Sequence, residues 1–305
     1  MSTSIGSTAV QAATRALVLG GGGPVGRAWE AGLAAGLLLQ GIDLVGADLI
    51  IGTSAGAIVG AEIALGLDLD AVGPATDSPG GAAPSQISPG GMHRMMAATA
   101  RAATSPQPEL ELQEVGQIAL TAATCSEEES LSRITFAPVS GRQWPPNFQA
   151  TSVGTRTGRF QLWTAASGVP LERAVAASSA LPNVWPPITI DQDRYMDGGM
   201  RSVLNADLAA GYGRIVVVSC FALGEPDIGD TPAAPQDRSP RGEIESLRAG
   251  GSTVEVVAPG SAFLALTGNG TRMLDSSLVP EAYEVGKRQA KDDGARIRAA
   301  WLIDE

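Results

Sequence analysis

The sequence predicts an α/β protein with three layers, in which helices cover both faces of a mainly parallel central sheet. Two short apolar runs, at residues 16–19 and 48–51, have the length and composition of buried strands. Each is followed by a segment with a helical pattern, at residues 26–40 and 55–65. A strand–helix–strand–helix opening is typical of parallel sheets, because parallel neighbours need a crossover that a helix usually supplies.

The later elements are spread over the whole chain, with no internal repeat, and this predicts a single domain over residues 1–305. Its core would span about residues 15–220, with a C-terminal strand and helix at residues 252–303 packing on it. Strands are expected at residues 148–154, 159–164, 188–190, 194–196, 214–219 and 253–258, and helices at 109–130, 171–179 and 281–302.

The segment 73–108 differs from the rest in composition, because it is rich in Gly, Pro, Ser and Ala. One short helical piece is expected around residues 92–101. Long segments of this kind are often functional, which favours a lid or loop over the site. Met92, Met95 and Met96 are flexible apolar side chains that suit a lipid-facing surface, although a surface loop with no role is an equal alternative.

Composition and charge exclude several classes of function. Of 305 residues, 44% are hydrophobic and 17% charged, and the net charge is −11, which is typical of a globular chain. Such a negative surface gains nothing from binding phosphates, so no nucleic-acid partner is expected, and membrane contact would be at most peripheral and apolar. Residues 1–14 lack a basic start and an apolar centre, and no long apolar run predicts a membrane helix. These features predict a cytoplasmic location; the oligomeric state stays open.

No metal or other cofactor is predicted. Cys125 and Cys220 are too few for a disulfide framework or a metal cluster, and Cys220, close after an apolar run, is expected to be a buried thiol. Asp68 and Asp70 lack the spaced oxygen ligands and the glycine of a calcium loop.

The first motif with chemical meaning is Gly-Thr-Ser-Ala-Gly at residues 52–56, which matches the G-x-S-x-G nucleophile elbow. It follows a predicted buried strand and opens a predicted helix, as the sharp turn of an elbow requires. Gly52 and Gly56 would let the chain turn so that the Ser54 hydroxyl is exposed, and the helix would point its positive end at developing negative charge. The alternative is an ordinary strand–helix turn in which Ser54 caps the helix.

The second motif is a run of four glycines at residues 20–23, directly after the first predicted strand. The backbone N–H groups of Gly21, Gly22 and Gly23 could stabilise the oxyanion of an acyl-transfer intermediate. Gly21, Gly23 and Gly26 also fit the G-x-G-x-x-G pattern of dinucleotide sites. Such a site needs an acidic residue at the end of the second strand, where this chain has Gly-Thr-Ser, so the dinucleotide interpretation is disfavoured.

The third motif is Asp197-Gly198-Gly199, which by itself could be a simple turn. The single histidine of the chain, His93, precedes Asp197, whereas a conventional Ser–acid–His triad would place it after the acid. His93 is expected to face solvent or to lie in the lid. The lysines Lys287 and Lys291 both fall on the C-terminal helix, so a carboxylate is the better candidate for the base of Ser54.

Taken together in this order, the three motifs resemble the patatin-like phospholipases. The similarity covers about residues 15–220, and the loop Ala-Ser-Ser-Ala-Leu-Pro at residues 177–182 also looks like one found in that family. The resemblance implies a patatin-like fold and hydrolysis of acyl-lipid esters.

In site residues, the resemblance implies a Ser54–Asp197 dyad and an oxyanion hole at Gly21–Gly23, supported by the motif glycines Gly52, Gly56, Gly198 and Gly199. Plant patatins commonly have an arginine two residues after the glycine run. Here that position is Val25, and Arg27 is the nearest substitute.

Two other classes stay open at this stage. An acyltransferase or thioesterase could use the same dyad on a non-lipid acceptor or substrate, and a binding module could keep the fold without catalysis. Burial would raise the pKa of Asp197 and hydrogen bonds from nearby amides would lower it, and the sequence does not decide between the two. In either case a carboxylate base predicts that kcat/KM is lost only on acidification to roughly pH 4–6, with no further ionisation near pH 6.5–7.

Overall fold

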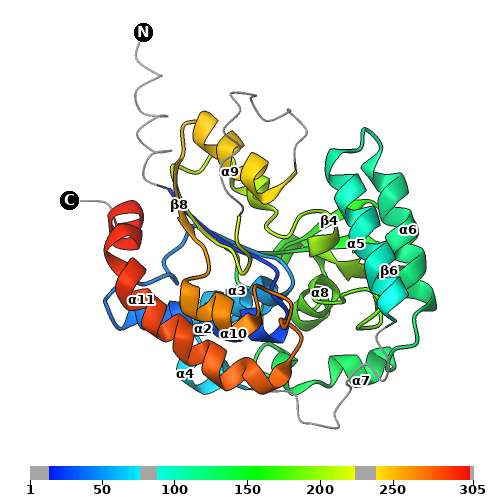
Figure 1. Cartoon of the computed structure of the whole chain (residues 1–305), viewed down its shortest axis with the longest axis horizontal. Coiled ribbons are helices and arrows are strands. Elements are labelled where there is room, and N and C mark those ends of the chain that lie inside the picture. The colour runs from blue at the N-terminus through cyan, green and yellow to red at the C-terminus, as the bar shows by residue number, and fades with distance from the viewer. Residues whose placement is uncertain (1–13, 76–87, 224–237, 303–305) are drawn as a thin grey trace.

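A computed structural model describes residues 14–75, 88–223 and 238–302, and these form one eight-stranded sheet with helices on both faces (Figure 1). The strand order is β5-β6-β3-β2-β1-β7-β8, with β4 paired to β3. The pairs β3–β2, β2–β1, β1–β7 and β7–β8 are parallel, and the pairs of β3 with β4, β3 with β6 and β5 with β6 are antiparallel. The strands are β1 (Arg15–Leu19), β2 (Leu49–Gly52), β3 (Phe148–Gly154), β4 (Phe160–Trp163), β5 (Ile188–Ile190), β6 (Asp193–Asp197), β7 (Arg214–Val218) and β8 (Thr253–Val257).

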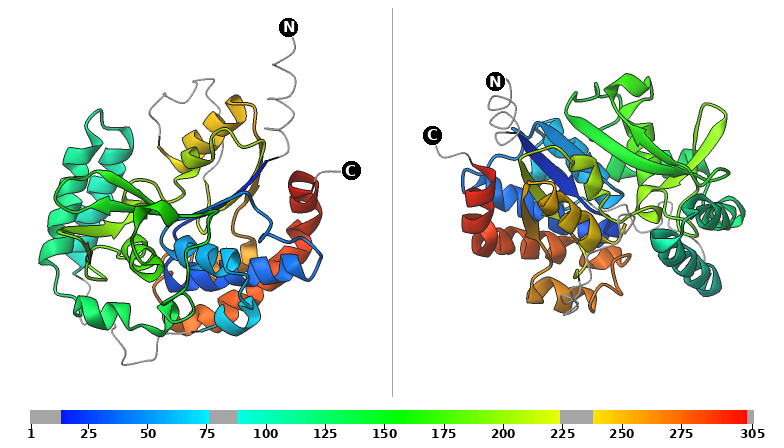
Figure 2. Two further views of the ribbon diagram at one scale, coloured as in Figure 1. Left: turned by 180° about the vertical axis from the view of Figure 1, so that it is seen from behind. Right: turned by 90° about the horizontal axis from the view of Figure 1, so that it is seen from above.

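The two faces of the sheet carry cores of unequal size. Alternate residues of each strand point to opposite faces, so neighbours in β1 enter different cores. Leu17 and Leu19 of β1 pack into a large core with several helices, whereas Ala16 and Val18 pack into a smaller core with α9 (Pro240–Ala249). In Figure 1 and in the left view of Figure 2, α9 lies on one side of the sheet and the helices of the large core lie on the other. Four helices supply most of the helical residues of the large core, namely α2 (Gly23–Leu38), α3 (Ala55–Ala64), α8 (Leu171–Ser178) and α11 (Val279–Trp301).

A helical hairpin of α5 (Pro89–Thr104) and α6 (Pro108–Thr121) forms a third apolar cluster with Val153 of β3 and Met196 of β6. Val153 and Gln149 of β3 are four residues apart and therefore point to the same face of the sheet. Gln149 pairs with Ile51, which packs into the smaller core with α9. The hairpin and α9 therefore cover the same face of the sheet at opposite ends.

Strand β3 brings the ends of β2 and β6 together. Ala150 pairs with β2 and β4, and Ser152 pairs with β6 and β4. Because a strand has only two edges, β2 and β6 must share the edge opposite β4. Strand β2 runs parallel to β3 and β6 runs antiparallel to it, so their carboxyl ends meet head to head beside Thr151. The sequence motifs that follow β2 and end β6 are thereby brought into contact.

The predicted fold class is confirmed, and the predicted strands are all found with boundaries close to those expected. The expected helix at residues 109–130 divides into α6 and α7 (Glu127–Leu131), because Ser126 caps a new helix with a capping box. Helix α9 and the short helix α10 (Ser261–Thr267) were not predicted.

The segment 73–108 contains a longer helix than expected, since α5 extends from Pro89 to Thr104 and buries Met95 while leaving Met96 exposed. Residues 76–87 lie outside the described part of the chain, so a lid role for this segment stays a prediction. Among the described helices, none is long and apolar enough to cross a membrane.

Candidate active site

Ser54 occupies a strained turn between β2 and α3. Its backbone angles are φ 55° and ψ −116°, and every other non-glycine residue with positive φ in the described ranges is Asn or Asp, which tolerate this region better. A hydroxyl residue in such a conformation costs about 1–3 kcal/mol, which the surrounding structure must offset. Strain at a predicted nucleophile supports the elbow interpretation over an ordinary cap, and Ser54 makes no side-chain capping bond to α3.

The two motif glycines are required by close backbone approach. A Cβ on Gly52 would lie 2.4 Å from the Ala57 Cα, and one on Gly56 would lie 2.2 Å from the Leu19 oxygen. The Gly56 N–H donates to the Gly20 and Thr53 oxygens at 3.0 and 2.9 Å. These contacts hold the turn directly against the end of β1.

Asp197 lies at the end of β6 with its carboxylate against Ser54. The Ser54 Oγ donates to Asp197 Oδ2 at 2.6 Å, and the Gly199 N–H donates to Asp197 Oδ1 at 2.7 Å. Each carboxylate oxygen therefore has one partner, and the bond to Gly199 fixes the oxygen that does not face the serine. Gly198 must be glycine, since a Cβ there would lie 2.1 Å from the Thr151 Oγ1.

Burial makes Asp197 a stronger base than an ordinary aspartate. The residue is only 2% exposed, and burial raises its pKa from the usual 3.8 to about 7, against the smaller lowering effects of the bonds from Ser54 and Gly199. The expectation of an acid limb at pH 4–6 therefore has to be revised upward. Desolvation outweighs the hydrogen bonds here because few donors reach the carboxylate.

The glycine turn lies beside the nucleophile. A Cβ on Gly21 would be 3.4 Å from the Ser54 Cβ, so Gly21 lies about one side-chain atom away from the serine. The Gly21 N–H already donates to the Val203 oxygen at 2.8 Å. Within the described ranges, no residue accepts a hydrogen bond from the N–H groups of Gly22 or Gly23. Of the three predicted oxyanion donors, Gly22 and Gly23 are thus the two whose N–H groups could donate to a substrate.

Glycine is also required in the turn for packing. A Cβ on Gly22 would lie 2.5 Å from the Cys220 Sγ, and Gly23 has a φ of +59°. Cys220 is 2% exposed, as predicted, and burial raises its pKa well above the usual value, so it is a neutral packing residue. The turn is therefore seated on the end of β7.

Two serines with no role in the sequence motifs bind the backbone of Ser54. The Ser178 Oγ accepts from the Ser54 N–H at 3.0 Å, and the Ser179 Oγ donates to the Ser54 oxygen at 3.1 Å. Both lie at the end of α8, in the loop that resembles one of the patatin-like family. The resemblance marked this loop, but only the tertiary structure shows what its hydroxyl groups bind.

Arg27 does not substitute for an oxyanion arginine. It is 3% exposed, and its Nη2 binds Glu62 Oε1 at 2.7 Å and the Val72 oxygen at 3.0 Å, while its Nη1 binds the Ala75 oxygen at 3.1 Å. Glu62 belongs to the second half of α3, whereas Ser54 precedes the first residue of that helix. Arg27 is a structural link between α2, α3 and the chain that follows.

We expect the Arg27→Met variant to lose about 3–5 kcal/mol of unfolding free energy, because Glu62 would remain buried without its partner. The double variant Arg27→Met/Glu62→Met should recover most of this loss, and kcat per folded molecule should be unchanged in both. Arg101→Met is the matched control, since Arg101 pairs with Glu111 at the exposed surface and its loss should cost under about 1 kcal/mol. Urea unfolding measures all three variants. A large loss of kcat in folded Arg27→Met would contradict the structural role.

His93 is exposed on α5 and forms no described contact with Ser54 or Asp197, in agreement with the prediction for it. Within the described ranges, no group of His, Cys, Asp and Glu side chains could hold a metal ion. Asp70 instead accepts hydrogen bonds from Tyr283 and Lys287 of α11.

Part of the chain matches a known family. Residues 90–210 match the family model described as patatin-like phospholipase. That range includes Asp197, Gly198 and Gly199, while the glycine turn and Ser54 precede it. No curated protein matches the sequence.

Two solved structures are similar over most of this chain. One is VipD from Legionella pneumophila, with 12% identity and a TM-score of 0.44, covering 92% of this chain and 67% of VipD. The other is the type III effector protein ExoU, with 13% identity and a TM-score of 0.34, covering 91% of this chain and 53% of ExoU. The chain thus spans only about half of ExoU.

The family match confirms the resemblance predicted from the sequence: residues 90–210 are similar to the patatin-like phospholipases.

Proposed function

We propose that this protein hydrolyses carboxylic esters of acyl lipids, phospholipids included, through a Ser54–Asp197 dyad and an acyl-enzyme intermediate. The observation that carries the proposal is the 2.6 Å bond between Ser54 Oγ and Asp197 Oδ2, made from a strained turn at the start of a helix. A nucleophile within hydrogen-bond reach of a base, which a third group orients, is the arrangement that covalent catalysis needs.

In the first half of the reaction, Asp197 Oδ2 takes the Ser54 proton while Oγ forms a bond to the acyl carbon. The N–H groups of Gly22 and Gly23 and the positive end of α3 stabilise the oxyanion. The carbon–oxygen bond to the alcohol then breaks, and Asp197 returns its proton to the leaving alcohol. In the second half, a water molecule gives a proton to Asp197 while its oxygen bonds to the acyl carbon. The bond from that carbon to Ser54 Oγ then breaks, and Asp197 returns the proton to Oγ, which releases the acid and restores Ser54.

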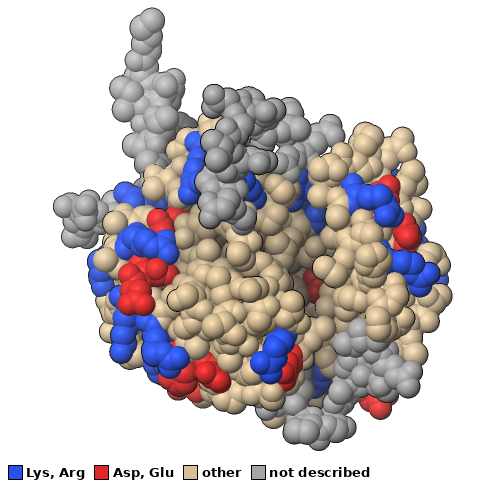
Figure 3. Space-filling model, viewed as in Figure 1, with Lys and Arg blue, Asp and Glu red and all other residues tan. Residues whose placement is uncertain are grey.

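The surroundings of the site are compatible with an apolar acyl group. Phe221 and Leu274 are each 36% exposed, and both lie near the glycine turn: a Cβ on Gly23 would lie 3.1 Å from the Leu274 side chain, and Phe221 adjoins Cys220. In Figure 3, the surface between α10 and the α5–α6 hairpin is largely uncharged and hollowed, whereas charged residues gather at its margins. A cytoplasmic location stays a prediction.

The proposal is tested by covalent labelling with a fluorophosphonate, in which the serine oxygen displaces fluoride from phosphorus. We expect one label per molecule, located on Ser54 by peptide mass spectrometry, and no label in Ser54→Ala. Labelling of another serine, or of Ser54→Ala at the parent rate, would contradict the nucleophile assignment.

Substrate class is tested with the same protein. Phosphatidylcholine vesicles, an acyl thioester, and an ester with a competing alcohol acceptor should be compared for release of free acid. We expect Ser54-dependent release of fatty acid from the vesicles. Preferential thioester cleavage, or transfer to the alcohol in place of hydrolysis, would instead favour a thioesterase or an acyltransferase.

A further inference from the structure

Asn205 is a fully buried polar residue that no part of the mechanism above uses. It lies between the short helical turns η3 (Gly198–Met200) and η4 (Ala206–Ala209), with φ 52° and ψ 38°, a left-handed conformation that asparagine tolerates. Its own N–H donates to the Ser202 Oγ at 3.0 Å, and the next N–H, of Ala206, donates to Glu243 Oε2 at 2.9 Å. The backbone around Asn205 is therefore fixed on both sides.

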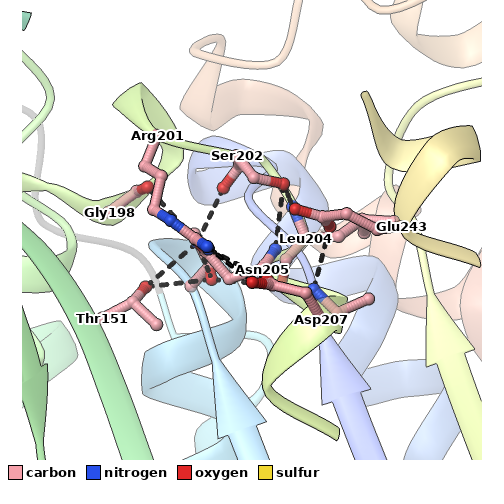
Figure 4. Close-up of polar contacts among 10 residues, drawn as sticks. Thr151, Gly198, Arg201, Ser202, Leu204, Asn205, Asp207 and Glu243 are labelled. Carbon is pink, nitrogen blue, oxygen red and sulfur yellow. Dashed lines mark hydrogen bonds and ion pairs between the residues drawn. The ribbon is translucent and has the colours of Figure 1, made fainter. Parts of the chain in front are cut away.

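The Asn205 carboxamide contacts a residue next to each member of the dyad, Thr53 beside Ser54 and Gly198 beside Asp197. Figure 4 shows Asn205 among Thr151, Gly198, Arg201 and Ser202. The Asn205 Nδ2 lies 3.0 Å from Thr53 Oγ1, which precedes the nucleophile, and 3.3 Å from the Gly198 oxygen, which follows the acid. It also lies 3.4 Å from Thr151 Oγ1, at the point on β3 where β2 and β6 meet. The shortest contact, at 2.7 Å, is to the Ser202 oxygen in the loop of Asn205 itself, so the two N–H groups of the amide are shared among these four acceptors.

The direction of these hydrogen bonds is fixed by Arg201. Its Nη1 donates to Asn205 Oδ1 at 2.6 Å, and because a guanidinium can only donate, the carboxamide must turn its nitrogen toward Thr53. Asp207 holds the same guanidinium through Nη1 at 2.9 Å and Nη2 at 2.5 Å. Thr53 Oγ1 then accepts from Asn205 and is free to donate to Thr151 Oγ1 at 3.0 Å, which in turn lies 3.4 Å from the Gly52 oxygen.

We propose that Asn205 is a positioning residue, which fixes the distance between Ser54 and Asp197 by binding Thr53, Thr151 and the carbonyl of Gly198. The proposal rests on the function proposed above. Strands β2 and β6 each pair with β3 and do not pair with each other. The side-chain network of Asn205 therefore connects the residues next to Ser54 and Asp197 across this junction. A displacement of about 1 Å between reacting groups can cost about 10²-fold in rate.

Two substitutions test Asn205 directly. Asn205→Asp keeps the shape but replaces both N–H donors with an acceptor, and Asn205→Gly keeps the left-handed backbone while removing the carboxamide. We expect kcat on a short soluble ester, and the fluorophosphonate labelling rate, to fall about 10²-fold in each, with KM within about 2-fold of the parent. A purely structural role would lower the melting temperature and leave kcat per folded molecule unchanged.

Asn183 supplies the matched control. It is 4% exposed, has a φ of +67°, and donates from Nδ2 to the Ser88 oxygen at 2.9 Å at the start of α5. Asn183→Asp and Asn183→Gly should therefore lower the melting temperature without changing kcat or the labelling rate.

Thr53→Val keeps the inference testable if the Asn205 variants do not fold. Valine has the shape of threonine without the hydroxyl, and we expect kcat to fall about 10-fold or more with KM unchanged. In a double-mutant cycle, Thr53→Val should add little to the loss caused by Asn205→Gly, because the two residues act through one network.

The outcomes separate this inference from the proposed function. Parent-level kcat in folded Asn205→Asp and Asn205→Gly, or in Thr53→Val where those variants do not fold, would overturn the positioning role and leave the dyad standing. Full additivity in the cycle would likewise overturn the shared network. Failure of the parent protein to label at Ser54 would overturn the proposed function itself.

Discussion

Replacing Asp197 by asparagine is expected to lower kcat/KM for ester hydrolysis by at least about 10⁴-fold, and Ser54→Ala should have an effect at least as large. Asparagine fits the site, since its Oδ1 can accept from the Gly199 N–H and its Nδ2 can donate to the Ser54 Oγ. The variant keeps the geometry but cannot take a proton. Steady-state hydrolysis of a soluble ester at pH 8 measures both effects.

The two residues act as one unit, so the double variant Ser54→Ala/Asp197→Asn should be little worse than Ser54→Ala alone. His93→Gln is the control for a histidine base and should retain parent activity, because His93 is exposed on α5. A His93→Gln variant as inactive as Ser54→Ala would overturn the dyad assignment.

The second large effect is on pH dependence, because burial raises the pKa of Asp197 to about 7. The base must be ionised to act, so kcat/KM should rise between about pH 5 and 8, with half of the activity present near pH 7. An imidazole base would titrate in the same range, and the pH profile alone does not distinguish the two. The distinguishing result is that His93→Gln should leave this limb unchanged.

The same group should make stability depend on pH. An aspartate with its folded pKa raised to about 7 holds its proton in the native state after the unfolded chain has lost it near 3.8. Its contribution therefore destabilises the protein as pH rises from about 4 to 7, by up to about 4 kcal/mol. Asp197→Asn removes this cost, so its advantage in unfolding free energy over the parent should grow across that range and level off above it.

Urea unfolding of the parent and Asp197→Asn at pH 4, 6 and 8 measures this difference. Asn183→Asp, which introduces a carboxyl at another buried position, controls for the effect of a buried acid outside the site. An Asp197→Asn variant that is less stable than the parent at pH 8 would show that Asp197 is not held in a desolvated state.

The motifs of the site could be predicted because each has a local cause. A G-x-S-x-G turn between a buried strand and a helix depends on small residues at fixed spacing, and Gly52 and Gly56 are indeed excluded from carrying a Cβ by backbone contacts. Elimination of the single histidine and the two lysines favoured a carboxylate as the base, and the resemblance to the patatin-like family identified that carboxylate as Asp197. Residues chosen in this way depend little on where the rest of the chain lies.

The supporting residues could not be predicted, because their partners are distant in sequence. Ser178 and Ser179 bind the backbone of Ser54 across more than 120 positions, and Asn205 binds Thr53 across 152. Serine, threonine and asparagine at such positions are equally typical of helix ends and turns. The hydrogen bond from the Gly21 N–H to the Val203 oxygen likewise could not be predicted, because it depends on the tertiary structure that places Val203 beside Gly21.

By itself, the sequence determined the fold class, the strands and the motifs that carry the chemistry, because hydrophobic periodicity and turn chemistry are local properties. Only the tertiary structure decided how β2 and β6 meet head to head along β3, and with that the 2.6 Å contact between Ser54 and Asp197. It also decided the strength of the base, since the pKa of Asp197 is set by how completely other segments remove the carboxylate from water.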